Sequence, residues 1–281
     1  MQVIEDISTM RAWSETERRH DRRVVLVPTM GFLHEGHLSL VREAKRRGDR
    51  VVVSVFVNPT QFGPNEDFAT YPRDFERDRA LLEKELVDVV FHPTVDDMYP
   101  KGFQTYVEVE PLSRLLCGAT RAGHFRGVAT VVAKLLNIVR PHAAIFGEKD
   151  YQQLQLIRRM VRDLDIDVEI IGHPIVREPD GLAMSSRNAY LTAAQRRAAV
   201  CLSRSLCRAE RLVKRGETSA KAIVRLARSE LEQEPLATIE YVELRDAETL
   251  EEINNIERAA VLALAVQIGK ARLIDNRVLT H

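Results

Sequence analysis

Two histidines three residues apart are the first side chains in this sequence that indicate chemistry. His34 and His37 enclose Gly36 in the pattern His-x-Gly-His, and at this spacing both rings would share one helix face. A neutral imidazole can donate a hydrogen bond to a phosphate oxygen, and an imidazolium can offset charge on a leaving pyrophosphate. Because so short a pattern also occurs by chance, the alternative is two histidines near a helix start without a shared role.

The histidine pair lies at the joint between a predicted strand and a predicted helix. Residues 24–27 are an apolar run typical of a buried strand, and residues 38–48 repeat apolar side chains at helical spacing. The N–H groups and the dipole at a helix start favour an anion there. Gly31 and Gly36 have the spacing of a P-loop, but His37 stands where that motif needs lysine, and no Gly-x-Gly-x-x-Gly is present. The joint therefore predicts an anion site of a different kind.

Other polar side chains stand at later joints of the chain. Residues 185–187, Ser-Ser-Arg, would form a compact phosphate clamp, or alternatively a polar loop whose serine caps a helix. Lys149, at a predicted strand-to-helix turn, is either a phosphate ligand or a solvated lysine. Asn58, Gln61 and Gln153 carry amides that can donate to and accept from a hydroxyl-bearing substrate, although most glutamines are surface residues.

Composition limits the class of protein. Charged residues make up 29% and apolar residues 45% of the 281 positions, which is the balance of a water-soluble globular protein. Lys+Arg and Asp+Glu both number 41, so the zero net charge argues against a protein that coats nucleic acid. Three scattered cysteines, no basic-apolar leader and no membrane-length apolar run predict a cytoplasmic protein without a membrane partner.

Strands and helices alternate over the first two thirds of the chain. This alternation predicts an α/β fold, a Rossmann-like doubly wound parallel sheet whose ligands bind beyond the carboxyl ends of the strands. The loops at 28–37, 58–64 and 147–150 would meet at that edge. The pattern changes after Ile171, so we predict one domain at 1–176 and a smaller C-terminal α+β domain at 177–281. A short strand and a helix are expected within 3–20, further strands at 24–27, 50–57, 87–91, 105–109, 143–146 and 167–171, and helices at 38–48, 71–86, 124–139 and 151–164. In the second domain, helices are expected at 192–214 and 219–232 and strands at 239–244, 260–266 and 272–274.

The two phosphate-type segments together resemble the signatures of the class I adenylate-forming and nucleotidyl-transferring superfamily, in which both grip ATP. Arg187 stands where many relatives carry lysine. Five colinear blocks resemble the pantothenate synthetase (pantoate–β-alanine ligase) family more closely. They are Pro-Thr-Met-Gly-x-Leu-His-x-Gly-His at 28–37, Val-Asn-Pro-x-Gln-Phe at 57–62, Tyr-Pro-Arg at 71–73, Phe-Gly-Glu-Lys-Asp-Tyr-Gln-Gln-Leu at 146–154 and Gly-Leu-Ala-Met-Ser-Ser-Arg-Asn at 181–188. After about Leu191 the similarity lies in layout rather than in motif.

The resemblance implies a two-step reaction. The carboxylate of pantoate attacks the α-phosphorus of ATP, which gives pantoyl adenylate and pyrophosphate, and the amine of β-alanine then displaces AMP to give pantothenate. The family also implies Mg²⁺ bridging the phosphates and a homodimer. Residues 1–176 would bind ATP and pantoate, and residues 177–281 would act as a lid, so that the histidines and the serine-arginine clamp converge on one triphosphate.

The resemblance also implies a role for each matched residue. His34 and His37 would contact the phosphates, with His37 as the acid-type partner of the pyrophosphate. Gln61 and Gln153 would bind pantoate, and Gln61 could also face β-alanine. Asp78 would contact the metal; the alternative for it is a solvated helix residue.

Further residues are implied by the same match. Arg121 and His124 would lie near the substrate pocket. The residues assigned to ATP are Met30, Gly31, Phe32, Leu33, His34, Glu35, Gly36, His37, Gly147, Glu148, Lys149, Asp150, Val176, Met184, Ser185, Ser186 and Arg187, and those assigned to catalysis are His34, His37, Lys149, Ser185, Ser186 and Arg187.

Three other functions share the ATP motifs. A nucleotidyltransferase acting on a phosphorylated cofactor precursor would release pyrophosphate but no AMP. An aminoacyl-tRNA synthetase fragment conflicts with the neutral charge and with the lack of a separate RNA-binding domain. A nucleotide-binding protein without enzymatic activity would not need the Gln61 and Gln153 pair.

Overall fold

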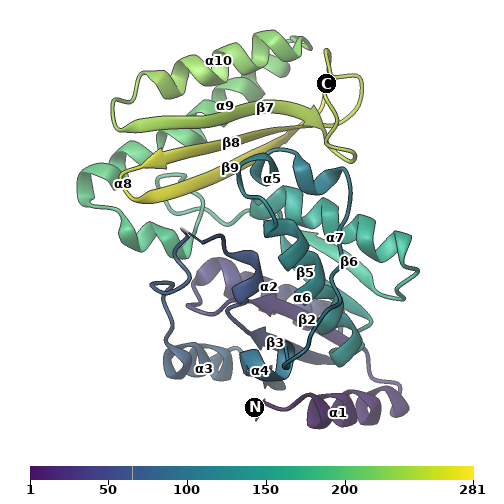
Figure 1. Cartoon of the computed structure of the whole chain (residues 1–281). Helices are drawn as coiled ribbons and strands as arrows, with labels where there is room; N and C mark the ends of the chain where they lie inside the picture. The colour runs from purple at the N-terminus through teal and green to yellow at the C-terminus, as the bar shows by residue number, and fades with distance from the viewer. Residues whose placement is uncertain (65) are drawn as a thin grey trace. The chain divides into compact units, whose positions relative to one another are not determined.

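The computed structural model describes residues 1–64 and 66–281, which fold into two compact units (Figure 1). The first unit comprises Met1–Arg114, Gly118–Glu148 and Leu156–Pro174. The second unit comprises Leu115–Cys117, Lys149–Gln155 and Ile175–His281. Two short segments from the first two thirds of the chain therefore belong to the second unit.

The first unit contains a parallel β-sheet, which in the described chain has six strands in the order β1-β4-β3-β2-β5-β6. Neighbouring strands pair in parallel, as the alternation of strands and helices predicted. The chain runs outward from β2 through β3 to β4 and then returns to β5 on the other side of β2. The strands are β1 (Gln2–Ile4), β2 (Val24–Thr29), β3 (Arg50–Val55), β4 (Val89–Phe91), β5 (Ala143–Gly147) and β6 (Glu169–His173).

Alternate side chains of the strands face two helical layers. Val25 and Val27 of β2 belong to a buried cluster with Val41 of α2 and Leu82 of α3. Leu26, the residue between them, points to the opposite face, where α1 and α6 contact β2. Both faces of the sheet are thus covered, which confirms the doubly wound fold class. The helices are α1 (Ile7–Arg19), α2 (Glu35–Arg47), α3 (Phe75–Lys84), α4 (Val95–Met98), α5 (Cys117–Thr120), α6 (His124–Val139) and α7 (Tyr151–Asp163).

The change of direction between β2 and β5 creates a topological switch point. In open parallel sheets, ligands bind beyond the carboxyl ends of the strands at such a point. Leu26 pairs with Ala144, so the two strands run side by side toward this edge. The segment that begins at Met30 leaves β2 there, and Glu148 leaves β5 there.

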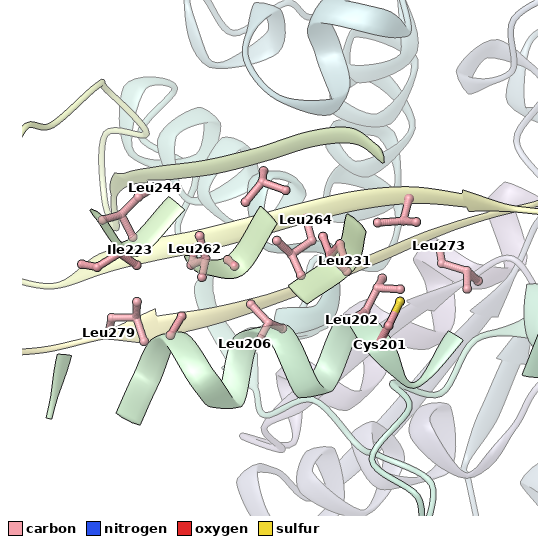
Figure 2. Close-up of a cluster of buried hydrophobic side chains, with 14 of the residues drawn as sticks. Cys201, Leu202, Leu206, Ile223, Leu231, Leu244, Leu262, Leu264, Leu273 and Leu279 are labelled. Carbon is pink, nitrogen blue, oxygen red and sulfur yellow. The ribbon is translucent and has the colours of Figure 1, made fainter. Parts of the chain in front are cut away.

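The second unit has a small antiparallel sheet packed on helices. Strands pair in the order β7-β8-β9, and Figure 2 shows Leu202 and Leu206 of α9 next to strand residues such as Leu264 and Leu273. Because Leu202, Leu206 and Leu264 are almost fully buried, their transfer from water is a main source of this unit's stability. The elements are α8 (Ala193–Ala199), α9 (Cys201–Val213), α10 (Ala220–Glu232), β7 (Ala237–Asp246), β8 (Ala260–Ile268) and β9 (Ala271–Leu279).

Two predicted elements are wrong. Residues 105–109, all within the described chain, form no strand, because the N–H of Val107 donates to the hydroxyl of Thr130 in α6 at 3.0 Å rather than to a neighbouring strand. The single helix predicted over 192–214 is broken at Val200 into α8 and α9. The hydroxyl of Ser203 donates to the Val200 carbonyl at 3.1 Å, and such local bonds bend helices. None of the helices in the described part of the chain combines the length and apolar character needed to cross a bilayer.

Candidate active site

The loop between β2 and α2 delivers the histidine pair. Its backbone is left-handed at Gly31, with a φ of 79°, and at Phe32, with a φ of 48°. Glycine adopts this conformation without strain, whereas phenylalanine does so only when its surroundings hold it there. His34 is the N-cap of α2 rather than a residue within the helix, as its φ of −135° shows.

The two imidazoles are brought together at this helix start. Their ring centroids are 4.0 Å apart, and the backbone N–H of His34 donates to Nδ1 of His37 at 3.3 Å. When Nδ1 accepts this bond, the proton of a neutral His37 ring is on Nε2. The pair therefore combines imidazole N–H donors with the positive end of the α2 dipole, which is chemistry suited to an anion.

Two residues of α3 hold the loop in front of the histidines. The carboxylate of Asp78 is 1% exposed and accepts hydrogen bonds from the backbone N–H of Phe32 at 2.6 Å and of Leu33 at 2.7 Å. Arg77 donates to the Leu33 carbonyl at 2.9 Å, and its guanidinium lies over the Phe32 ring. Burial raises the pKa of the Asp78 carboxyl, and the two N–H donors oppose that shift. Asp78 is thus a buried loop clamp, and the alternative of a solvated helix residue is wrong.

Gln61 lies in the short helical turn η1 (Pro59–Gln61) that follows β3, and its side chain is largely buried. Its Oε1 accepts from Nδ2 of Asn58 at 3.0 Å, and its Nε2 donates to the sulfur of Met30 at 3.1 Å. A thioether is a weak acceptor, so a carboxylate or hydroxyl oxygen would be a stronger partner for this amide. The structure therefore joins two of the predicted site residues, Gln61 and Met30.

Residues at the start of α6 support the same turn. Nδ1 of His124 is 2.7 Å from the carbonyl oxygen of Gln61, and Nε2 of His124 is 2.9 Å from Nη1 of Arg121. Arg121 also pairs with both oxygens of Glu66. Burial, the largest single effect, would raise the pKa of Glu66, but the hydrogen bonds and positive charge of Arg121, with smaller contributions from Gly63 and His124, together hold that pKa below its usual value. Arg121 and His124 thus position Gln61 through its backbone.

The backbone of α6 at Gly127 lies very close to the turn that carries Gln61, and we did not predict this contact from the sequence. A Cβ atom at Gly127 would lie 2.3 Å from the Thr60 carbonyl oxygen, which explains why α6 needs glycine there. The Gly127 carbonyl also accepts from Nδ2 of Asn58 at 3.2 Å. Glycine at this point of a strongly apolar helix is the feature that could have revealed the contact.

The second unit contains the other predicted phosphate residues. Lys149 and Ser185 line one small cavity together with Asn188 and Asp275. The hydroxyl of Ser185 accepts from the N–H of Arg187 at 3.3 Å, so this serine caps the turn η4 (Ser186–Tyr190). The capping serine that the sequence allowed is therefore present, and it faces the cavity that also holds the lysine.

The remaining predicted residues are distributed over both units. In the first unit, Glu35 pairs with Arg42, the Gly36 carbonyl accepts from the Ser39 hydroxyl at 2.7 Å, and Gly147 ends β5. In the second unit, the N–H of Met184 donates to the Val176 carbonyl at 3.0 Å, which closes the hairpin that precedes Ser185. The rest are Glu148 and Asp150 in the turn η3 (Glu148–Asp150), and Gln153 in the first turn of α7, which is half-buried.

The fold and these side chains define an α/β protein with a site suited to an anionic ligand: a doubly wound sheet has imidazoles at its switch point, and the second unit carries a lysine and a serine. A family model described as pantoate-beta-alanine ligase matches residues 2–278. The chain belongs to this family and is a ligase that forms pantothenate.

Similarity to individual proteins extends over the whole chain. The pantothenate synthetase of Thermotoga neapolitana is 58% identical over 99% of this chain and 100% of its own length. That of Geobacter sulfurreducens is 57% identical over 99% of both. A crystal structure of the Thermus thermophilus pantothenate synthetase has a TM-score of 0.93 at 47% identity, covering 99% of both chains. The Francisella tularensis ligase, complexed with beta-gamma ATP and β-alanine, has a TM-score of 0.80 at 36% identity, covering 99% of this chain and 97% of its own.

Proposed function

We propose that this ligase joins pantoate to β-alanine in two steps, through a pantoyl-adenylate intermediate. A carboxylate is a poor acyl donor, so it must first gain a good leaving group. In the first step a pantoate oxygen bonds to the α-phosphorus of ATP, and the bond to pyrophosphate breaks. In the second step the amine of β-alanine bonds to the acyl carbon, AMP leaves with the bonding electrons, and the amine loses a proton.

The observation that carries the proposal is the close pair His34 and His37, whose rings are 4.0 Å apart and tilted by 35°, at the start of α2 beside the switch point of the sheet. Negative charge grows on the departing pyrophosphate, and donors fixed in advance stabilise such charge most effectively. His37, with Nδ1 occupied by a backbone donor, would present Nε2–H to it. The Francisella tularensis relative, complexed with beta-gamma ATP and β-alanine, supports ATP and β-alanine as substrates.

The second unit would supply the remaining phosphate contacts. Lys149, Ser185, Ser186 and Arg187 would bind the triphosphate, because the first two line one cavity and the others follow directly along the turn. The rest of the nucleotide would be held by the loop that begins at Met30 and by Gly147, Glu148, Asp150, Val176 and Met184.

Pantoate would be held by Gln61 and Gln153. The amide of Gln61 is held by the Asn58 side chain, and its Nε2 donates to a sulfur atom, a weak acceptor that a substrate oxygen could replace. A substrate fixed in this way keeps its carboxylate in line with the α-phosphorus, and positioning of this kind lowers the barrier to a bimolecular step. Gln61 would remain close to β-alanine in the second step.

Magnesium would enter as the ATP complex. Among residues 1–64 and 66–281, no three His, Cys, Asp or Glu side chains gather closely enough to hold a metal ion. Mg²⁺ is commonly held by one or two carboxylates and the substrate phosphates, so a preformed protein cage is not required. Asp78 stays a predicted metal contact, although both of its oxygens already accept backbone hydrogen bonds.

The domain and assembly assignments complete the proposal. Residues 1–176 would bind ATP and pantoate and residues 177–281 would close over the nucleotide, with the histidines and the serine-arginine clamp converging on one triphosphate. The family resemblance supports a homodimer and a cytoplasmic location. Light scattering of the purified chain would test the dimer.

One assay tests the reaction sequence. Exchange of radiolabelled pyrophosphate into ATP should require pantoate and should not require β-alanine, and β-alanine should then release AMP. A nucleotidyltransferase would never release AMP, and a binding protein would show no exchange. Exchange that required β-alanine would contradict a separate adenylation step.

A further inference from the structure

Strand β9 contributes to a buried polar network that has no role in the proposed reaction described above. Asp275 is 1% exposed, and its two oxygens accept from Nη1 of Arg177 at 2.7 Å and from Nη2 at 2.9 Å. Burying a charge is costly unless it is paired and hydrogen-bonded, so this ion pair needs an explanation.

Each member of the network reaches one of the two proposed phosphate segments. Nη1 of Arg177 donates to the Gly181 carbonyl at 3.0 Å, inside the hairpin that ends at Ser185. Asn276, the residue after Asp275, donates from Nδ2 to the Lys149 carbonyl at 2.9 Å, and its own N–H donates to Asp275 at 2.8 Å. The dipeptide Asp275-Asn276 of β9 is therefore linked to both segments, directly to the Lys149 turn and through Arg177 to the 181–187 loop.

We infer that Arg177, Asp275 and Asn276 are positioning residues, which hold the Lys149 turn and the 181–187 loop at the spacing that the ATP triphosphate requires. This inference rests on the proposed function of Lys149 and Ser185. Asp275 lines the same small cavity as Lys149 and Ser185, so an unpaired Asp275 carboxylate would repel a phosphate group that these two residues bind nearby. Arg177 therefore neutralises that charge as well as fixing the loop.

The chain offers a matched control in the same unit. Glu230 of α10 is 4% exposed and pairs with Arg204 and Arg208 of α9. It is likewise a buried carboxylate held by arginine, but its partners lie on helices that carry no proposed ATP residue. Asp275→Asn and Glu230→Gln thus make the same chemical change, one with and one without a link to the phosphate segments.

The test measures KM for ATP, KM for pantoate and kcat, together with thermal unfolding with and without ATP. Asp275→Asn should raise the KM for ATP about tenfold or more, leave the KM for pantoate within about twofold and reduce stabilisation by ATP. Asn276→Ala should raise the KM for ATP in the same direction. Glu230→Gln should lower the melting temperature without changing either KM. An unchanged KM for ATP in Asp275→Asn overturns the inference.

A double variant separates positioning from stability. Replacing a buried ion pair by apolar residues often preserves or improves stability, so Arg177→Met with Asp275→Leu should fold even if Asp275→Asn does not. Its KM for ATP should stay raised, because the bonds to the loop are gone. Recovery of both the melting temperature and the KM for ATP would mean a purely structural pair and would overturn the inference.

Lys149→Ala distinguishes this inference from the proposed function. If Lys149→Ala loses activity while Asp275→Asn keeps the KM for ATP of the unmodified protein, the positioning role fails and the proposed site stands. If Lys149→Ala keeps its activity, the proposed role of Lys149 fails. In that case a raised KM in Asp275→Asn still supports positioning of the 181–187 loop, and an unchanged one overturns it.

Discussion

The turn that carries Gln61 can be displaced by a single methyl group added from α6. In Gly127→Ala the new Cβ would lie 2.3 Å from the Thr60 carbonyl oxygen and 2.7 Å from the Gln61 nitrogen, whereas ordinary contact begins at 3.4 Å. The turn and the helix must therefore separate by about 1 Å, because backbone atoms cannot rotate out of the way as a side chain can.

The expected effect on catalysis is larger than the effect on folding. Over-packing costs about 1–3 kcal/mol, and the better helix propensity of alanine returns up to about 1 kcal/mol, so the protein should still fold. A substrate misplaced by about 1 Å can react up to about 100-fold more slowly. We therefore expect kcat/KM for pantoate to fall about 10- to 100-fold in Gly127→Ala, with a much smaller change in the KM for ATP.

The assay varies pantoate at saturating ATP and then ATP at saturating pantoate, with a melting curve for each variant. Gly63→Ala is the control, because its Cβ would meet only the Glu66 side chain, at 3.6 Å, and its kinetics should stay within about twofold. A folded Gly127→Ala enzyme with kcat/KM for pantoate unchanged would refute the reasoning. Equal losses for pantoate and ATP would indicate general damage and would also contradict it.

Five further variants test individual residues. Asp78→Asn leaves one acceptor for two backbone donors and should destabilise the protein by about 2 kcal/mol in urea unfolding; unchanged stability would show that the clamp is dispensable. His37→Ala should abolish pyrophosphate release with an unchanged melting temperature, and turnover retained within about tenfold, only about 1.4 kcal/mol, would contradict its role. Gln61→Ala and Gln153→Ala should each raise the KM for pantoate more than that for ATP; equal losses would remove the assignment. The pKa of Glu66 is lowered from 4.5 in the folded state, so its ionisation stabilises the fold above that pH and this contribution disappears as the pH falls through the folded pKa. The melting temperature of Glu66→Gln should therefore lie below that of the unmodified protein at pH 7 and approach it in acid, and a constant gap would refute the linkage.

Elements with strong local patterns were predictable from the sequence. β2 begins at Val24, as its continuous apolar run indicated, and α6 spans His124–Val139, as its apolar periodicity indicated. These patterns depend on residues that are close in sequence, so the elements can be predicted without knowledge of the fold. Residues 105–109 lie in a less regular region but also have a strand-like pattern; a strand needs a hydrogen-bonding partner, and the N–H of Val107 donates instead to Thr130.

The candidate site divides in the same way. His34, His37 and Ser185 could be singled out as candidates, because their residue types and spacing, taken together, resemble known phosphate-binding segments. The hydrogen bonds between Asp78 and the histidine loop could not be predicted. An acidic residue on a charged helix is expected to face solvent until the structure shows that it is buried. The ion pair of Arg177 could not be predicted either, because its partner Asp275 lies 98 residues further along the chain.

By itself, then, the sequence determined the alternating α/β architecture, the family resemblance and the residue types offered to the substrates. Only the tertiary structure decided which groups hold those residues in place, such as Asp78 under the histidine loop and Gly127 under the Gln61 turn. The physical reason is that local preference acts over one or two turns of chain. Burial and hydrogen bonding between distant segments depend instead on the path of the whole chain, which brings residues 45 to 98 positions apart into contact.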